Sequence, residues 1–398
     1  MKIAFLTSGG NAPCLSATIG RLLYNYSNLN DNVEIIAYKN GFMGLLKGNS
    51  INISLSNLNN NSFDIFYEYG GSPIGNSRVK LTNRDDCINK NLIEDTQDPL
   101  EVAATQLIND EIDILHPIGG DDTNSTARDL SNFIKSRGLN ITIVGIPKTI
   151  DNDIYPVKRS LGAYTAAEAG AMYFKNIVNE NNMSNFHLII HELMGRNSGW
   201  LAAKTASMYY EMLEHKKNKL KDFESLSFYK SNRLDIHALY IPERRVDFAV
   251  EISRLKKVIN RVNCLNVFVS EGTFLNEISN QHTNMDTDAF GHIKLDSIDT
   301  GKWLSELISK EMRIDKVLVQ KSGYFSRSSA PSQDDINYIF KICDFGFKQA
   351  IQGNSGVAAE DQRTDVLACI DFNEIKGDKK LNIQSNWFKK LDREISNE

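Results

Sequence analysis

The chain has 398 residues, of which 41% are hydrophobic and 24% charged, so we expect a globular protein of two domains with ample core. Its formal net charge of −5 argues against a nucleic-acid partner, because there is no basic excess to neutralise phosphates. No apolar run approaches the ~20 residues that span a bilayer, and none has the form of a secretion signal, so we expect a cytoplasmic protein that binds no membrane. The five cysteines lack CxxC spacing, which indicates reduced thiols rather than a disulfide or zinc framework.

The N-terminal segment predicts a strand, a glycine turn and a helix. The apolar residues 2–6 end in the turn TSGGN, and Pro13 suits the first turn of a helix whose apolar residues then recur at three- to four-residue spacing. This geometry points free backbone N–H groups at a phosphate. Neither a Walker motif nor GxGxxG is present, so a phosphate site and a plain turn between strand and helix both stay open.

The second informative segment is GGSPIGNSR, at residues 70–78, which follows a second predicted strand at residues 33–38. Its three glycines allow the backbone to approach an anion closely, and Arg78 can act as a forked partner. An exposed turn with a solvated arginine is the alternative.

Two polar clusters follow neighbouring predicted strands. Residues 112–118 end in GGDDT, which puts Asp121 and Asp122 at the end of a strand, and Thr123 or Asn124 is expected to cap the next helix. In an open α/β sheet, ligands bind at the carboxyl ends of the strands. The pair of carboxylates is therefore a candidate ligand site.

The second cluster is IPKTIDND, residues 146–153, after a β-type run at 141–145. Lys148 with Asp151 and Asp153 can hold an anion, a metal and a proton acceptor together. A polar loop that caps the next helix is the alternative reading, and the nearby GGDDT cluster favours a site. The alternation of strands and helices up to a long helix at 161–178 predicts a parallel, doubly wound sheet.

The pattern then restarts in the second half of the chain. Predicted strands at 187–193, 236–241, 266–269 and 316–321 each run into a polar loop, with helices at 248–262, 301–312 and from 334 to 351. We therefore expect a second domain of the same class, followed by a tail with a strand, a basic turn and a short helix.

The motifs along the chain occur in a definite order: LTSGGNAP, GGSPIGNSR, PIGGDDT, PKTIDND, MGRNSGWLA, IPE, SEGTF and SGYFSR. In this order they resemble the phosphofructokinase family, and more narrowly its pyrophosphate-dependent branch. The resemblance implies an α/β fold of two Rossmann-like lobes with mostly parallel sheets and the active site in the cleft between them. It assigns residues 1–160 and about 328–360 to the lobe for pyrophosphate and Mg²⁺, and residues 161–327 and 361–398 to the lobe for fructose 6-phosphate.

The resemblance also implies a reaction. A pyrophosphate-dependent 6-phosphofructokinase transfers a phosphoryl group from pyrophosphate to the 1-hydroxyl of fructose 6-phosphate, reversibly, in glycolysis and gluconeogenesis. Such transfer needs a metal-bound donor, cations over the transferring group and a base for the acceptor hydroxyl. By the resemblance, Asp121 works with Mg²⁺ as cofactor and Asp151 is the base, in a homodimer or homotetramer.

The resemblance carries three overlapping groups of site residues onto this sequence. The catalytic group is Asp151, Lys148, Asp122 and Arg196; the donor-binding group is Gly10, Arg78, Asp122 and Lys148; and the group binding fructose 6-phosphate is Thr149, Ile150, Asp151, Met194, Gly195, Arg196, Glu243, Lys321, Tyr324, Phe325, Ser326 and Arg327.

Two positions indicate the donor. ATP-using relatives usually have glycine after the GGD aspartate, which leaves room for the α-phosphate, whereas this chain has Asp122. A carboxylate ~4 Å from a phosphate oxygen costs on the order of 4 kcal/mol at an effective dielectric of about 20, or roughly a thousandfold in affinity. Lys148 likewise replaces a glycine of the main bacterial ATP-using group and offers a charge to the transferring phosphoryl group. Both residues favour pyrophosphate.

The chain departs from the family pattern at a few positions. His187 stands where bacterial ATP-using enzymes carry an arginine that reaches a neighbouring subunit, and Ser328 and Ser329 replace glycines. No nucleotide effector site is traceable, so we expect no strong control by ADP. The alternatives are an ATP-dependent 6-phosphofructokinase and, from another class, a non-catalytic regulatory subunit on the same fold. Such a subunit should have lost Asp121 or Asp151, and both are present.

Overall fold

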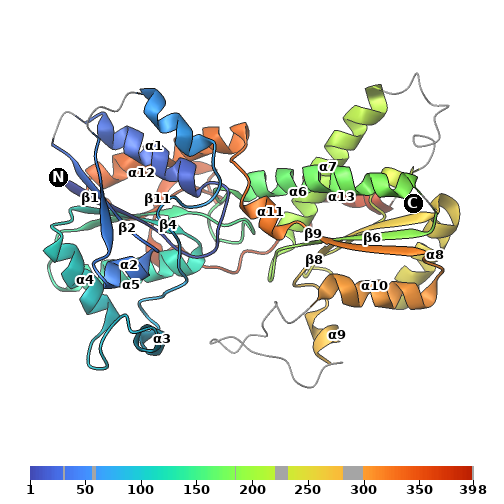
Figure 1. The fold of residues 1–398 in the computed structure, drawn as a ribbon, viewed down its shortest axis with the longest axis horizontal. Coiled ribbons are helices and arrows are strands. Elements are labelled where there is room, and N and C mark those ends of the chain that lie inside the picture. The colour runs from blue at the N-terminus through green and yellow to red at the C-terminus, as the bar shows by residue number, and fades with distance from the viewer. Residues whose placement is uncertain (30–31, 56–59, 184, 220–231, 281–298, 397–398) are drawn as a thin grey trace. The chain divides into compact units, whose positions relative to one another are not determined.

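The structure is a computed structural model that describes residues 1–29, 32–55, 60–183, 185–219, 232–280 and 299–396 (Figure 1). The chain divides into two compact units. Unit 1 comprises Met1–Thr165 and Arg327–Lys379, and unit 2 comprises Ala166–Ser326 and Lys380–Glu398. The expected boundary in the tail is corrected for residues 361–379. They belong to unit 1 because the strand β11 (Val366–Ile370) pairs with β10 (Gly356–Asp361).

Unit 1 contains a seven-stranded sheet with the order β11-β10-β5-β4-β1-β2-β3. The two edge strands, β11 and β3, run antiparallel to their neighbours, and the remaining pairs are parallel. The buried strand β4 reads as a nearly continuous apolar run, as expected for a parallel strand covered on both faces. The strands are β1 (Lys2–Thr7), β2 (Glu34–Tyr38), β3 (Ser50–Ile53), β4 (Ile114–Gly119), β5 (Thr142–Pro147), β10 and β11.

Helices cover both faces of this sheet. Figure 1 shows α1 and α12 together on one face, with α2, α4 and α5 on the other. Asp98 caps α4 by accepting hydrogen bonds from the backbone N–H groups of Leu100 and Glu101, and Pro99 occupies the first turn. The helices are α1 (Leu15–Ser27), α2 (Phe42–Leu46), α3 (Arg84–Asn89), α4 (Pro99–Asn109), α5 (Asp121–Ser136) and α12 (Gln333–Ile351), with short 3₁₀ segments at Asn60–Tyr67 and Phe372–Glu374.

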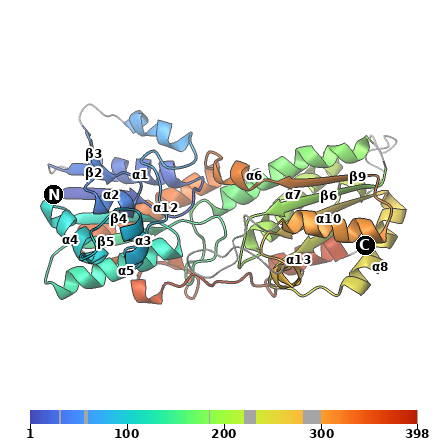
Figure 2. The ribbon, with the colours of Figure 1, turned by 60° about the horizontal axis from the view of Figure 1, so that its bottom comes forward.

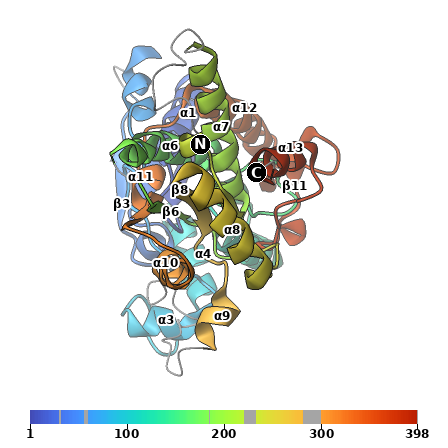
Figure 3. The same ribbon diagram turned by 90° about the vertical axis from the view of Figure 1, so that its right-hand side faces the viewer.

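Unit 2 contains a four-stranded parallel sheet with the order β7-β8-β6-β9. Its strands are β6 (His187–Leu193), β7 (Ala238–Tyr240), β8 (Cys264–Ser270) and β9 (Lys316–Lys321). Figures 1 and 2 show α10 on one face of this sheet and α6 with α7 on the other, and the C-terminal helix α13 lies next to α7 (Figure 3). The helices are α6 (Ala163–Ile177, which starts in unit 1), α7 (Trp200–Lys219), α8 (Phe248–Val262), α9 (Leu275–Ser279), α10 (Thr300–Glu311), α11 (Gly323–Arg327) and α13 (Asn386–Ser396), with 3₁₀ segments at Val178–Asn182 and Asn232–Leu234.

The expected fold class, α/β with mostly parallel sheets, is confirmed. Two local expectations are wrong. Asp121 and Asp122 lie inside the first turn of α5, with Gly120 at the cap position, so neither Thr123 nor Asn124 caps this helix. The side chain of Asn124 instead donates to the carbonyl groups of Gly119 and Gly120. The segment after β9 is the short helix α11 rather than an irregular loop.

Within the described part of the chain, no helix combines the length and apolar character needed to cross a bilayer. None of the five cysteines, all of which lie in described segments, takes part in a disulfide.

Candidate active site

Lys148 lies beneath the glycine turn that follows β1. Its Nζ donates a 2.6 Å hydrogen bond to the carbonyl oxygen of Gly10, and its side chain is only 3% exposed. Gly9 makes the turn possible, since its φ of +87° is readily adopted only by glycine. Burial lowers the pKa of Lys148 to about 8. A buried, partly satisfied ammonium group therefore lies directly under a turn of backbone.

The segment around Arg78 packs against the same turn. The N–H of Gly9 donates to the carbonyl of Ser77 at 2.9 Å, and Ser8 forms a parallel bridge with Ser77. Arg78 itself is exposed, and its charge contributes to lowering the pKa of Lys148. The predicted donor-binding residues Gly10, Arg78 and Lys148 thus lie together in unit 1.

Asp121 and Asp122 occupy the first turn of α5, where the helix dipole favours negative charge. Burial, and then the neighbouring charge of Asp122, raise the pKa of Asp121. Asp122 is 60% exposed and forms a 2.6 Å ion pair with Lys80. The carboxylate expected to repel a nucleotide is therefore partly neutralised by a lysine.

The loop after β5 brings the side chains of Thr149, Asp151 and Asp153 close to Asp121 and Lys148. The Thr149 hydroxyl accepts a 3.2 Å hydrogen bond from the backbone N–H of Asp151 and donates one to the carboxylate of Asp153. Burial, and then the charge of Asp121, raise the pKa of Asp153 to about 6. The negative charges of Asp121 and Asp151 both favour the charged form of Lys148. Ile150 is buried and belongs to the packing of the loop.

The charge of Asp121 raises the pKa of Asp153, and a divalent cation would relieve this repulsion. The backbone of Gly377 closes over Asp121, since a Cβ at Gly377 would overlap the Asp121 carboxylate. Within the described residues, no group of three or more His, Cys, Asp or Glu side chains forms a metal cage. One or two carboxylates are what Mg²⁺ uses when substrate phosphates and waters complete its shell, so the residues present fit this ion.

In unit 2, the loop after β6 carries Met194, Gly195 and Arg196, and it is held by the loop after β8. The hydroxyl of Ser270 donates to the Gly195 carbonyl at 2.6 Å, and the Gly195 N–H donates to a Glu271 oxygen at 3.2 Å. Gly195 has a φ of +131°, and a Cβ at Gly272 would overlap the Arg196 carbonyl oxygen. Glycines thus allow two backbones to touch around Arg196.

The helix α11 packs against the same loop. A Cβ at Gly323 would lie 2.6 Å from the methyl carbon of Met194, so these two predicted site segments adjoin. Tyr324 and Phe325 are 71% and 55% exposed, and Ser326 is buried. Arg327 is the first residue of the returning part of unit 1.

Glu243 and Lys321 are already engaged within unit 2. Both carboxylate oxygens of Glu243 accept from the Gly199 N–H at 3.0 Å, just before α7, and one of them accepts from the Leu381 N–H at 2.9 Å. Lys321 pairs with Glu192 at 2.9 Å and with Asp299 at 3.2 Å. Any sugar phosphate bound by Lys321 would share this lysine with two carboxylates.

His187 begins β6 and is fully buried. Burial, followed by the charges of Lys316 and Arg233, lowers its pKa, so the ring is neutral at pH 7. It therefore does not replace the charge of the arginine that other family members carry at this position.

The structure adds residues that the sequence did not single out as site residues. Asp153 was part of the predicted polar cluster but not of the residues carried over from the family, and it interacts with Asp121 and Thr149. Lys80 and Gly377 had no sequence signal, because each meets its carboxylate partner only through the tertiary fold.

The geometry of unit 1, with a buried lysine, a glycine turn and clustered carboxylates at the strand ends, suits the handling of a phosphate and a metal. The family model described as phosphofructokinase matches residues 2–211 of this chain. The chain is 44% identical, over 97% of its length and 94% of the relative's, to the pyrophosphate--fructose 6-phosphate 1-phosphotransferase of Methylotuvimicrobium alcaliphilum. It is 43% identical, over 99% of its length and 96% of the relative's, to the protein of the same name from Methylomonas methanica.

Among solved structures, the pyrophosphate-dependent phosphofructokinase from Marinobacter aquaeolei superimposes with a TM-score of 0.73 at 17% identity, covering 100% of this chain and 90% of the other. At 17% identity, this match supports a shared fold and no more. The identity of more than 40% to the two relatives, over nearly the whole chain, supports common descent. The chain belongs to the phosphofructokinase family.

Proposed function

We propose that this protein transfers a phosphoryl group from pyrophosphate to the 1-hydroxyl of fructose 6-phosphate, giving fructose 1,6-bisphosphate and phosphate. The observation that carries this proposal is the combination of the buried Lys148 under the Gly10 turn with Asp122 in the first turn of α5. The first supplies a cation for a transferring phosphoryl group, and the second fills the space that an α-phosphate needs. The names of the full-length relatives support the same substrates.

On the donor side, pyrophosphate binds to the backbone of the Gly10 turn, to Arg78 and to Lys148. These groups neutralise the charge that spreads over the phosphoryl oxygens in the transition state. Asp121 and Asp153 would hold Mg²⁺, which supplies further charge neutralisation when bound. Because Lys148 is held by the Gly10 carbonyl, its ammonium group is pre-positioned.

On the acceptor side, Asp151 takes the proton of the sugar 1-hydroxyl, and Thr149 holds the loop by accepting from the Asp151 N–H. Arg196 is the principal cation of the unit 2 loop, with Tyr324 and Arg327 as further contacts to the 6-phosphate. Met194, Gly195, Phe325 and Ser326 shape this site. Glu243 fixes the start of α7 and the tail by accepting from the Gly199 and Leu381 N–H groups, and its carboxylate also accepts from a sugar hydroxyl.

Donor choice follows from Asp122 together with Lys80. The repulsion between Asp122 and an α-phosphate is smaller than for an isolated carboxylate, because Lys80 lies 2.6 Å away. The space that the Asp122 side chain occupies is therefore as important as its charge in excluding ATP. We propose further that the protein acts in the cytoplasm and that it forms a homodimer or homotetramer. Light scattering on the purified protein would measure the oligomeric state.

The test is an assay of fructose 6-phosphate phosphorylation with pyrophosphate or ATP as donor. The proposal predicts release of phosphate and formation of fructose 1,6-bisphosphate with pyrophosphate and Mg²⁺, and little product with ATP. Efficient turnover with ATP alone would favour the ATP-dependent alternative. No turnover with either donor, in a folded protein, would favour a regulatory subunit.

A further inference from the structure

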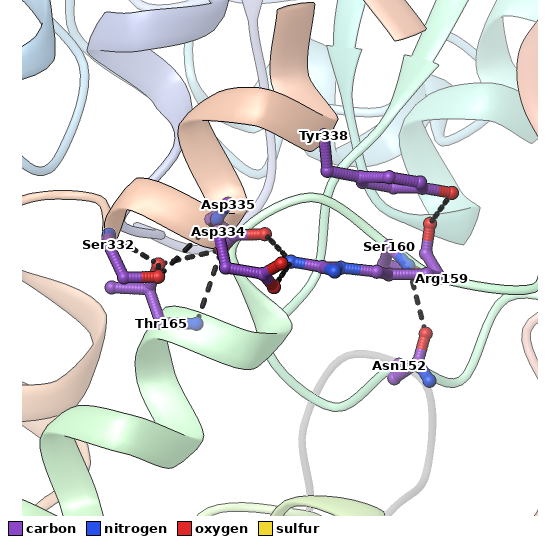
Figure 4. Close-up of polar contacts among 8 residues, drawn as sticks. All are labelled: Asn152, Arg159, Ser160, Thr165, Ser332, Asp334, Asp335 and Tyr338. Carbon is purple, nitrogen blue, oxygen red and sulfur yellow. Dashed lines mark hydrogen bonds and ion pairs between the residues drawn. The ribbon is translucent and has the colours of Figure 1, made fainter. Parts of the chain in front are cut away.

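Arg159 lies in a partly buried cluster that the proposed chemistry does not use (Figure 4). Its guanidinium group is paired with Asp334 at 2.7 Å and with the fully buried Asp335 at 2.8 Å. The same group lies 3.9 Å from the ring centroid of Tyr164 and 4.5 Å from that of Tyr338. An arginine held by two carboxylates and two rings has very little freedom, so the backbone at this position is fixed.

The cluster reaches the loop of Asp151 and Asp153 through one residue. Ser160, next to Arg159, donates its backbone N–H to the Asn152 side-chain oxygen at 2.9 Å (Figure 4). Asn152 is buried and adopts a left-handed conformation with a φ of +51°, which is unfavourable for most residues. This conformation persists because its side chain is held, and it sets the direction of the residues on either side.

A second donor completes the hold on Asn152. The Nζ of the half-buried Lys379 lies 3.3 Å from the same Asn152 oxygen and donates to the Val157 carbonyl at 2.6 Å. At the other end of the cluster, the hydroxyl of Thr165 donates to Asp335 at 2.7 Å. Thr165 and Lys379 are each the last residue of a unit 1 segment, so the cluster also anchors the chain where it leaves this unit.

We propose that Arg159 is a positioning residue for phosphoryl transfer, which acts through Ser160 and Asn152 to hold Asp151 and Asp153 in their reactive orientation. This inference rests on the proposed function. A rigid cluster outside the site is suited to the task, because a shift of ~1 Å in a catalytic group can cost on the order of a hundredfold in rate. Asn152 transmits the constraint directly, since it lies between the two carboxylates in sequence.

The molecule contains a matched control in the same unit. Arg21 forms a two-pronged pair with Asp344 of α12, with both contacts at 2.6 Å, and lies between the rings of Tyr24 and Phe340 at 4.8 Å and 4.3 Å. Asp335 belongs to the same helix. The two arginines thus make the same kinds of contact with one helix, but only Arg159 is next to a residue that binds Asn152.

The experiment compares Arg159→Met, Arg159→Lys and Asn152→Gly with Arg21→Met in the full-length protein. The readouts are kcat, the KM for each substrate and the melting temperature. We expect Arg159→Met and Asn152→Gly to lose at least about tenfold in kcat with KM values changed by less than about threefold. Arg159→Lys should recover part of kcat, and Arg21→Met should keep kcat while losing comparable thermal stability.

The inference is overturned by an Arg159→Met protein whose kcat stays within about twofold of the parent while its melting temperature falls as in Arg21→Met, because the cluster would then be purely structural. If Arg159→Met does not fold, Asn152→Gly decides alone, because glycine tolerates the left-handed conformation and removes only the side-chain anchor. An inactive parent protein would contradict the proposed function as well, whereas an active parent with unaffected variants would contradict only the positioning role.

Discussion

The loop of Lys148 to Asp153 in unit 1 and the loop of Met194 to Arg196 in unit 2 are held in contrasting ways. The first is fixed by side chains: Thr149 and Asn152 make hydrogen bonds inside the loop and to the segment after it, and burial shifts the pKa values of Lys148 and Asp153. The second is held at its backbone: the side chains of Ser270 and Glu271 bind the carbonyl and N–H of Gly195, and glycines at 195 and 272 allow the close approach of the two loops.

This difference predicts that changes in the two loops affect different kinetic constants. Displaced pKa values and a pre-positioned cation matter for bond making, so changes in the unit 1 loop should act mainly on kcat. A backbone cradle around Arg196 matters for holding an anion, so changes in the unit 2 loop should act mainly on KM. The following predictions test this contrast, beginning with the largest effect.

Asp151→Ser should reduce kcat by at least about a hundredfold, the usual scale for removal of a general base, with the KM for fructose 6-phosphate nearly unchanged. Steady-state kinetics with pyrophosphate measures both quantities, and binding of fructose 6-phosphate to the variant by calorimetry is the control. Turnover within a few-fold of the parent would rule out Asp151 as the base and erase the contrast between the loops.

Asp122→Gly should improve the affinity for ATP by on the order of 30-fold, if Lys80 already cancels about half of the repulsion expected from an isolated carboxylate. Pyrophosphate turnover should fall, because a contact is lost. Inhibition by ATP and its use as a donor measure the change.

Two controls separate space from charge at this position. Lys148→Gly alone should damage pyrophosphate catalysis without admitting ATP, and the double change should be non-additive because both side chains face the same phosphates. Lys80→Met removes the neutralising partner but opens no space, so ATP should not improve. An Asp122→Gly protein that still ignores ATP would place specificity elsewhere, for example in the segment 70–78.

Gly272→Ala should raise the KM for fructose 6-phosphate by about tenfold, with kcat changed far less, because a methyl group forces Arg196 to move. Gly170→Ala is the control in the same unit, where a new methyl group would lie 3.0 Å from Thr205 and in ordinary contact, at 3.5 Å, with the hydroxyl of Ser326. If Gly272→Ala lowered kcat and left KM unaltered, the assignment of affinity to this loop would be wrong.

The smallest effect concerns pH. Because burial lowers the pKa of Lys148 to about 8, the ammonium group loses its proton as the pH rises through that value, and the donor site loses a cation. The kcat/KM for pyrophosphate should therefore fall by about threefold across the pH unit centred there. Lys148→Arg keeps its charge at these pH values and should lack this falling limb, whatever its absolute rate.

Much of the fold was predictable because buried parallel strands are continuous apolar runs. The expected strands at 187–193 and 316–321 and the helix at 248–262 have the bounds of β6, β9 and α8. The five residues of α11 are too few to show a helical period. The tail was misassigned because the hairpin of β10 and β11 joins the sheet through β5, which lies about 200 residues earlier in the chain.

The motifs also placed several candidate residues correctly in one neighbourhood. Gly10, Arg78, Asp121 and Lys148 lie together in unit 1 because each follows the end of a parallel strand or packs on such a segment. Their assigned chemical roles stay predictions. The Asp122–Lys80 pair, by contrast, joins residues about 40 positions apart that no periodicity connects.

Local order along the chain was enough to indicate the family, the alternation of strands and helices, and the residue types at the strand ends. How charged each of those groups is, and how firmly it is held, depends on the folded structure. The contact of Lys148 with Gly10, the closure of Gly377 over Asp121 and the contact of Lys379 with Asn152 all bring together segments that are distant in sequence. Desolvation and hydrogen bonding depend on everything that surrounds a group, and that environment exists only once the chain has folded.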